Sequence, residues 1–431
     1  MKRVLIITYY WPPSGGAGVQ RWLKFSKYLP EYGWQPVIYT PENPEAPVDD
    51  PSLLEDIHPD TLVIKRPIWE PYHLYKRFVG MGSGERINAG FLKENEKSEK
   101  KEGLSVWIRG NLFIPDARKF WIKPSARFLK KYLKDKPVDA IISTGPPHSM
   151  HLIALSLKRS LGLPWIADFR DPWTEIDFYD QLRLSRRSDR KHKIQENAVL
   201  HGADRVVVIG QQMAERFKSR NNADARVIPN GYDEADFSDL PVKNDTCFTI
   251  VHVGALNADR NHPIFWQVIA ELIAEDPELA ELLKVKLVGK TDVSVQQDIA
   301  RYGLEDSVEI QAYLPHKQII PLLQSADLLY LSINNTPNAR SIRTGKIFEY
   351  LAARRPILGI GPEDGDAATV IRECKAGEMV GFGDSDKLKT VLLNWLELHR
   401  KGEFKHLDTN ASKYSRKHLS SQLSDLLNAI S

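Results

Sequence analysis

The sequence predicts an α/β protein built from two Rossmann-like, doubly wound domains. Short, continuous apolar runs alternate with helical patterns, which is typical of parallel strands covered by helices on both faces. The same alternation starts again after a polar, turn-rich stretch at 229–246. A chain of 431 residues is too long for one ordinary core and suits two domains of roughly 150–200 residues each.

The first domain is predicted from six apolar runs. Each is followed by turn residues and then by a helical pattern, as at 19–29 after the first run. The runs lie at 4–8, 36–40, 61–65, 139–144, 164–169 and 205–210. A further short strand ends near Val227, where a rigid proline and an Asn-Gly turn follow. We therefore expect the first domain to span 1–228 and a linker to span 229–246.

The second domain is predicted from five more apolar runs and the helical patterns between them, for example 262–274 and 317–325. The runs lie at 248–254, 285–290, 308–313, 327–333 and 356–361. We expect this domain to span 247–395. After Gly383 the pattern is helical and charged, at 384–399 and 411–430, so residues 396–431 are expected to form helices that cross back to the first domain.

Two such domains that face each other would place the carboxyl ends of both sheets around one crevice. Open α/β sheets bind their ligands outside the carboxyl ends of their strands. The cleft between the domains is therefore the expected active site.

The composition excludes several classes of protein. A hydrophobic fraction of 42% and a charged fraction of 27% indicate a globular protein and not a disordered one. A net charge of +3 is too small for a general nucleic-acid binder. No apolar run reaches about 18 residues, and the first run is too short for a secretory signal. The two cysteines, Cys247 and Cys374, favour neither a disulfide framework nor a thiolate metal cluster, so we expect a cytoplasmic location.

One segment departs from this even composition. Between Lys65 and Lys136, Lys and Arg outnumber Asp and Glu by more than two to one, and aromatic residues are interleaved among them. This mixture suits an anionic acceptor or the inner face of a membrane, and makes peripheral membrane association one expectation. The alternative is the solvated face of ordinary amphipathic helices, around a charged loop at 93–102.

A glycine-rich loop follows the first strand and precedes a helical pattern. Its glycines, Gly15, Gly16 and Gly18, let the backbone approach a ligand, and the helix start offers free N–H groups to a phosphate or a hydroxyl. The alternative is a tight turn without a ligand.

Two further strand ends carry polar side chains. His148 follows the strand at 139–144 and could act as a base or orient a hydroxyl, because its pKa lies near neutrality. His151, one turn further on, is expected to face the packing between helix and sheet. Asp168, Arg170 and Asp171 follow the next strand and form either part of a site or a local brace. His148 and Asp171 are the candidate catalytic residues.

The hinge and the start of the second domain provide two more candidates. Asn230 lies in the Pro-Asn-Gly turn at which the cleft must hinge. Arg260 lies in the polar loop after the strand at 248–254, where its guanidinium could hold a diphosphate as a fixed cation.

The most informative segment is 341–359. Arg343, Gly345 and Lys346 lie at a predicted helix start, and Glu349 follows about one turn later. The two cations and the free N–H groups would meet diphosphate oxygens, while the Glu349 carboxylate could accept both hydroxyls of a ribose. The pattern indicates a nucleotide-diphosphate site. The alternative is an amphipathic helix with Glu349 on its solvent face.

This segment resembles the donor-binding segment of the family-4 glycosyltransferases, retaining enzymes of the GT-B fold that use UDP-, GDP- or ADP-sugars. The resemblance extends over nearly the whole chain, including the glycine-rich loop, the hinge at 229–233, the loop at 254–260 and the strand end at 287–289. It implies that the first domain binds the acceptor and the second binds the donor.

The resemblance also implies roles for single residues. The counterpart of Glu349 binds the donor ribose, basic side chains like Arg260 and Lys346 bind the diphosphate, and a histidine like His148 lies beside the sugar. The other residues expected at the donor are Gly16, Arg343 and Gly345. Those expected at the acceptor or in the cleft are Gly15, Gly18, Asp168, Arg170 and Asn230. We expect no metal or other cofactor, because the cations would stabilise the leaving diphosphate and no DxD-type pair occurs in a suitable place.

Two positions depart from the family. Ser341 stands where relatives often have a glutamate that contacts the donor sugar, and Ala255 stands where many have an arginine. The expected activity is transfer of a sugar from a nucleotide-diphosphate sugar to a glycan or lipid-linked acceptor, in polysaccharide or glycoconjugate biosynthesis. The sugar, base and acceptor stay open. The alternatives are a sugar-nucleotide epimerase of the same architecture and a non-catalytic nucleotide-sugar-binding protein.

Overall fold

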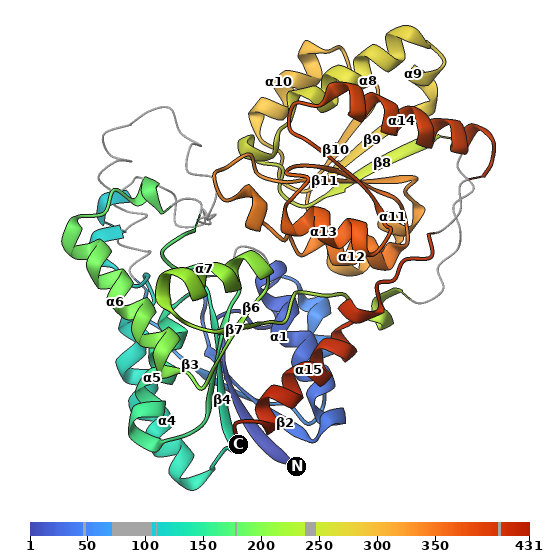
Figure 1. Ribbon diagram of the computed structural model, residues 1–431. Coiled ribbons are helices and arrows are strands. Elements are labelled where there is room, and N and C mark those ends of the chain that lie inside the picture. Colours follow the sequence, from blue (N-terminus) through green and yellow to red (C-terminus); the bar gives the residue numbers. More distant parts are fainter. Residues whose placement is uncertain (46–48, 71–105, 109, 177–178, 238–246, 404–406) are drawn as a thin grey trace. The chain divides into compact units, whose positions relative to one another are not determined.

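The computed structural model describes residues 1–45, 49–70, 106–108, 110–176, 179–237, 247–403 and 407–431. The chain divides into two compact units (Figure 1). Unit 1 consists of Met1–Pro229 together with Arg416–Ser431, and unit 2 consists of Asn230–Ser415. Each unit is described by itself below.

Unit 1 contains a parallel sheet of seven strands in the order β3-β2-β1-β4-β5-β6-β7. The strands are β1 (Lys2–Ile7), β2 (Trp34–Pro41), β3 (Leu62–Arg66), β4 (Ala140–Gly145), β5 (Trp165–Phe169), β6 (Arg205–Val208) and β7 (Ala225–Val227). Each of the six apolar runs of the first half of the sequence forms a strand. Sheet order changes direction between β1 and β4, where a doubly wound sheet presents its ligand side.

Helices bury both faces of this sheet. In β1, Val4 and Ile6 belong to one core cluster and Leu5 and Ile7 to another, because successive side chains of a strand point to opposite faces. This explains why the strand is apolar at every position. The helices are α1 (Ala17–Tyr28), α4 (Lys119–Asp135), α5 (Ser149–Leu161), α6 (Arg186–Gly202), α7 (Gln211–Asn221) and α15 (Arg416–Asn428), with short 3-10 turns η1 (Leu29–Tyr32), η2 (Pro51–Asp56) and η3 (Asp180–Leu182).

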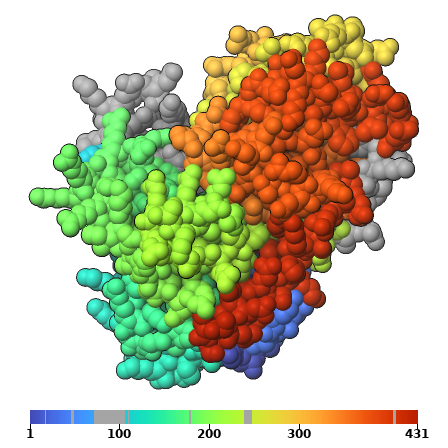
Figure 2. Space-filling model, viewed as in Figure 1, coloured from blue at the N-terminus to red at the C-terminus, as the bar shows by residue number. Residues whose placement is uncertain are grey.

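The last helix, α15, belongs to unit 1 although it ends the chain. Leu419, Leu423 and Leu427 occur at a spacing of four residues, which places them on one face of the helix. This face packs into the same core cluster as Val4 and Ile6. Figure 2 shows α15, in red, lying beside the blue N-terminal segments of unit 1.

Unit 2 contains a parallel sheet of six strands in the order β10-β9-β8-β11-β12-β13. The strands are β8 (Phe248–Val253), β9 (Leu283–Val288), β10 (Val308–Gln311), β11 (Leu328–Ser332), β12 (Ile357–Ile360) and β13 (Gly377–Val380). β13, an edge strand of four residues, was not predicted from the sequence. Its first residue has a φ of 144°, and a Cβ there would lie 2.0 Å from the Ile357 carbonyl oxygen, so glycine is required.

Helices surround the second sheet as well. They are α8 (Pro263–Glu275), α9 (Leu279–Leu282), α10 (Val293–Arg301), α11 (His316–Ser325), α12 (Lys346–Ala353), α13 (Asp366–Glu373) and α14 (Ser385–Arg400), with 3-10 turns η4 (Glu234–Phe237), η5 (Ala258–Arg260), η6 (Ala339–Ser341) and η7 (Ser412–Tyr414). The helical pattern expected at 411–430 is confirmed from Arg416 onward as α15, but Ser415 has extended backbone and separates this helix from η7. No helix within the described ranges is long and apolar enough to cross a membrane.

Candidate functional sites

Two cations lie near the carboxyl ends of β8 and β11 in unit 2. Lys346 is the first residue of α12, directly after Gly345, and Arg260 is the last residue of η5. The charge of Arg260 acts on Lys346, so the two side chains are close in space. The cation pair expected from the sequence pattern was Arg343 with Lys346, whereas the pair of Arg260 with Lys346 was implied by the family resemblance.

The Lys346 side chain runs past Gly254, the residue that follows β8. A Cβ at Gly254 would lie 2.6 Å from Lys346 Cε and 2.9 Å from its Nζ. Gly254 also has a φ of 100°, which side chains disfavour. Gly289 leaves room for this turn because it has no side chain: a Cβ at this position would lie 2.8 Å from the Gly254 carbonyl oxygen. Two glycines therefore make room for one lysine.

Arg260 is fixed by contacts with two loops. Its Nε donates to Asn334 Oδ1 at 2.8 Å and its Nη1 donates to the Ala255 carbonyl oxygen at 3.1 Å. Burial, and next the charge of Arg260, lower the pKa of Lys346 well below its ordinary value, while Glu349 acts in the opposite direction. Within the continuous described stretch 247–403, no carboxylate forms an ion pair with Lys346. Like charges held this close favour binding of an anion.

Glu349, three residues after Lys346, carries the carboxylate expected to bind a ribose. Its Oε1 lies 3.2 Å from His316 Nε2, and its side chain is 26% exposed. His316 begins α11 and was not foreseen from the sequence. The carboxylate is thus held by a side chain from another helix while it still reaches solvent.

Arg343 and Ser341 differ from the other donor candidates. Burial raises the pKa of Tyr414, and the charge of Arg343 is the main effect that opposes it. Arg343 also acts on Glu373. Ser341 Oγ donates to the Asn338 carbonyl oxygen at 2.8 Å within η6. Arg343 is therefore placed toward Glu373 and Tyr414, and Ser341 is engaged in its own turn.

In unit 1, Asp168 lies at the carboxyl end of β5 and is 1% exposed. Arg21, from α1, donates to it with Nη2 at 2.7 Å, and Trp22 Nε1 and Thr144 Oγ1 donate at 2.9 and 2.8 Å. Although burial raises the pKa of Asp168, the Arg21 charge and these hydrogen bonds outweigh it and hold the pKa below its ordinary value. The expected brace exists, but its arginine is Arg21.

Arg170 is also a brace. Its Nη1 donates to the Gly18 carbonyl oxygen at 3.0 Å and its Nη2 donates to the Pro146 carbonyl oxygen. A Cβ at Gly18 would lie 3.0 Å from Tyr10 Cδ2 and 3.3 Å from Arg170 Nη1, so a side chain there would crowd this approach. Asp171 is half-buried, and its charge acts on Arg170.

His148 and His151 lie at the start of α5. His148 stacks on Trp173, with ring centroids 4.6 Å apart and planes 5° apart. Its Nδ1 is buried and has no hydrogen-bond partner among the residues that the structure describes. Burial, and then the nearby His151, lower the pKa of His148, so the ring is neutral and its unpaired nitrogen can accept a hydrogen bond.

His151 has the packing role that was expected. Its Nδ1 lies 2.8 Å from Ser143 Oγ, and its ring stacks on Phe169. Burial lowers the pKa of His151 to about 3.

The remaining candidates are backbone positions. Gly16 precedes α1 with a φ of 86°, and a Cβ there would meet nothing within 4 Å. Gly15 is buried beside it. Asn230 is the first residue of unit 2 and is half-buried.

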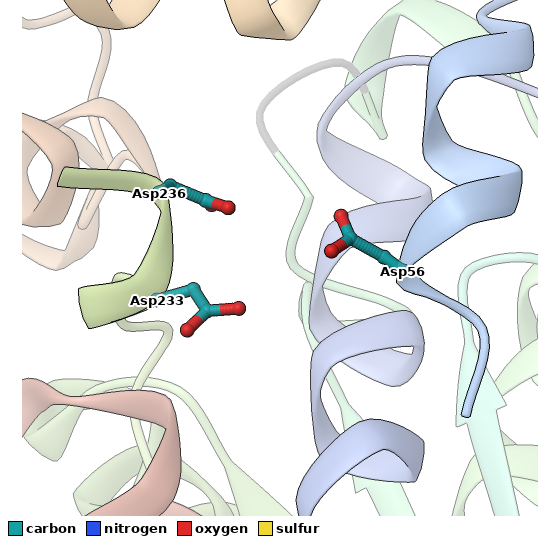
Figure 3. Close-up of side chains that lie close together, drawn as sticks. All are labelled: Asp56, Asp233 and Asp236. Carbon is teal, nitrogen blue, oxygen red and sulfur yellow. The ribbon is translucent and has the colours of Figure 1, made fainter. Parts of the chain in front are cut away.

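Three aspartates drawn in Figure 3 have local roles within their own units. Asp56 ends η2 of unit 1, where it pairs with Lys24 at 2.9 Å and Lys27 at 3.5 Å. Asp233 precedes η4 of unit 2 and accepts a hydrogen bond from the Ala235 N–H at 3.2 Å. Asp236 lies within η4. Transfer without a bound metal stays a prediction.

Comparison with known proteins supports the fold. Sucrose-phosphate synthase from Thermosynechococcus elongatus has a TM-score of 0.65 and 14% identity, over 100% of this chain and 99% of that chain. HepE from Anabaena, solved in complex with UDP-glucose, has a TM-score of 0.62 and 15% identity, over 100% of both chains. A putative UDP-N-acetylglucosamine 2-epimerase from Listeria monocytogenes has a TM-score of 0.56 and 11% identity, over 99% of this chain and 96% of that chain. No curated protein sequence matches the chain.

The two Rossmann-like units, with parallel sheets of seven and six strands, define the class of the protein: it has the two-domain GT-B fold. Residues 91–236 match the family described as Glycosyltransferase Family 4. The solved structures confirm the fold class expected from the sequence, and the match over 91–236 is to the family that the sequence resembles.

Proposed function

We propose that this protein transfers a sugar from a nucleotide-diphosphate sugar to a glycan or lipid-linked acceptor, with retention of configuration and without a bound metal. The observation that carries the proposal is the pair of neighbouring cations, Lys346 and Arg260, at the start of α12. A diphosphate would neutralise both charges and accept hydrogen bonds from the free N–H groups of the helix.

The donor side of the proposal follows from unit 2. Glu349 follows Lys346 by one turn and is partly exposed, so its two oxygens can accept the ribose hydroxyls. HepE was solved with UDP-glucose and shares the fold, which makes UDP-sugars the first donors to test. As the bond between sugar and diphosphate breaks, negative charge develops on the leaving group, and fixed cations stabilise it. Retention of configuration is proposed from the family alone.

The acceptor side is proposed from unit 1. The neutral ring of His148 has an unpaired nitrogen, which suits a group that accepts a proton or orients a hydroxyl. Asp171 is the second candidate catalytic residue. The basic helix α4, which carries Trp121 and Phe128 on its inner side, belongs to the segment proposed to meet an anionic acceptor or the inner face of the membrane. Residues 71–105 and 109 of that segment lie outside the described residues.

Thermal-shift measurements with UDP-, GDP- and ADP-sugars test the donor site. We expect one of them to stabilise the wild-type protein, and Glu349→Ala and Lys346→Ala each to abolish the shift while the melting temperature without ligand stays close to that of wild type. Lys401→Ala is the matched control, because Lys401 is an exposed lysine on the surface of unit 2 and forms an ion pair with Glu397. Unchanged binding in both site variants would overturn the donor assignment.

The epimerase is the second candidate, because a putative sugar-nucleotide epimerase has the same fold. The two activities differ in whether an acceptor is required. Incubation of the bound nucleotide sugar without acceptor, followed by chromatography of the sugar, separates them. Accumulation of an epimerised nucleotide sugar would favour the epimerase, and binding without turnover on any acceptor would favour a non-catalytic binder.

A further inference from the structure

His252 is a fully buried histidine in β8, two residues before Gly254. Its Nδ1 lies 3.0 Å from the Tyr330 carbonyl oxygen. Because a carbonyl only accepts hydrogen bonds, Nδ1 carries the proton of the neutral ring and Nε2 keeps its lone pair. Lys346 Nζ lies 3.2 Å from Nε2. The contact is therefore a hydrogen bond from the lysine to the imidazole.

Opposing groups act on the protonation of this ring. Burial, the charge of Lys346 and the charge of Arg260 favour the neutral form, whereas the carbonyl groups of Tyr330 and Ala255 favour the protonated form. Burial and the two positive charges outweigh the carbonyl groups, so the pKa of His252 lies well below its ordinary value. The acceptor on Nε2 is thus present at neutral pH.

A lysine at a binding site needs such a contact. Its stem has four rotatable bonds, and an amine that moves among several rotamers loses freedom when it binds a ligand. Gly254 leaves room for the stem on one side, and His252 accepts a hydrogen bond from its end. Glu349, on the same helix, and Arg260, from η5, are the charged groups that face Lys346.

We propose that His252 is a positioning residue for the donor: its neutral Nε2 accepts a hydrogen bond from Lys346 and holds the amine of this lysine beside Gly254, ready for a diphosphate. The inference rests on the donor site proposed above. It assigns to unit 2 a residue that acts on the ligand through another side chain.

Two substitutions separate positioning from packing. His252→Phe keeps the ring volume but removes the acceptor, and His252→Gln places an amide oxygen where Nε2 lies. The Tyr330 carbonyl oxygen keeps a second donor in both variants, the Tyr350 hydroxyl at 3.4 Å. Binding is measured by calorimetry with UDP, GDP or ADP, whichever gives the largest thermal shift with wild type. We expect about tenfold weaker binding in His252→Phe and binding within about threefold of wild type in His252→Gln.

A residue that only fills space would give the opposite order, with phenylalanine tolerated and glutamine harmful. That order, or equal loss in both variants, would overturn the proposal. A double-mutant cycle adds a second check: in a Lys346→Met background, His252→Phe should weaken binding no further. A full tenfold loss in that background would also contradict the proposal.

The two proposals can fail separately. If the wild-type protein binds none of the three nucleotides, the proposed donor site is rejected. If wild type binds one of them and His252→Phe binds it equally well, only the role of His252 is rejected.

Discussion

Unit 1 and unit 2 both bury charged side chains where parallel strands end, but they balance the charges differently. In unit 1 the Asp168 carboxylate receives hydrogen bonds from Arg21, Trp22 and Thr144, so its charge is compensated within the unit. In unit 2 the cations Lys346 and Arg260 lie together, and a neutral histidine is the hydrogen-bond partner of the lysine.

We use this difference to distinguish charges that stabilise the fold from charges that are available to bind a ligand. A buried ion pair with its remaining hydrogen bonds satisfied holds elements in place and offers little to a substrate. Two cations side by side raise the energy of the empty site, and an anion that binds there relieves this repulsion. We therefore expect Asp168 to stabilise the fold of unit 1 and Lys346 to bind the ligand.

The largest expected effect breaks the compensated pair. Asp168→Asn removes the buried carboxylate that Arg21, Trp22 and Thr144 bind, and should lower the free energy of unfolding of unit 1 by about 3–5 kcal/mol. Urea denaturation followed by tryptophan fluorescence measures this, because most tryptophans of the chain lie in unit 1. Glu31→Gln removes the exposed pair with Lys417 and should change the free energy of unfolding by less than about 1 kcal/mol. Similar effects of the two variants would contradict the structural role of Asp168.

A smaller effect is expected from the glycine beside the lysine. Gly254→Ala places a methyl group against the end of the Lys346 side chain and should weaken nucleotide binding about tenfold, as measured by calorimetry. Gly303→Ala is the control, because Gly303 also has a positive φ, 65°, but a Cβ there meets nothing within 4 Å. Both alanines strain the backbone. Equal binding by the two variants would show that Lys346 does not need the space at Gly254.

The smallest effect concerns pH. Burial and then Arg260 lower the pKa of Lys346, and only the protonated amine attracts a diphosphate strongly. Affinity should therefore be greatest below this lowered pKa and fall as pH rises through it, over a pH range in which an ordinary lysine stays charged. Dissociation constants for a nucleotide sugar over this range test the prediction. In Lys346→Arg the affinity should not change with pH, because an arginine stays protonated. A wild-type affinity independent of pH would contradict it.

Much of the fold could be predicted because each strand carries its own signal. A strand with both faces buried is apolar at every position, and a helix follows after turn residues, so neither needs distant information. The failures have local causes too. β13 is short, begins with a glycine required by Ile357 and exposes Glu378, so it has no apolar run. Ser415 interrupts a helical pattern without a proline or glycine to mark the break.

The donor residues could be predicted where they are close together in the sequence. Lys346 and Glu349 share one helix start, and their spacing is visible in the sequence. His252 and His316 were missed because each reaches its partner from a distant strand or helix. A histidine inside an otherwise apolar strand, directly before a glycine turn, is the signal that could have pointed to His252.

The Arg21–Asp168 pair shows the same limit. Asp168 was singled out because an acid after an apolar strand stands out, and Arg170 was its nearest arginine in sequence. The actual partner, Arg21, lies on α1, 147 residues away. The position of Arg21 on the inner face of its predicted helix indicated that this cation has a buried partner. The sequence alone does not say which acidic residue that partner is.

The assignment of α15 to unit 1 has a consequence for synthesis of the chain. The leucines of this helix complete a core begun by β1, so that core combines a strand synthesised before unit 2 with a helix synthesised after it. Unit 2 is one uninterrupted stretch of the chain, so it can fold before α15 of unit 1 has been synthesised. Deletion of residues 416–431 should therefore harm the N-terminal unit, whose apolar face would be left uncovered for chaperones or aggregation.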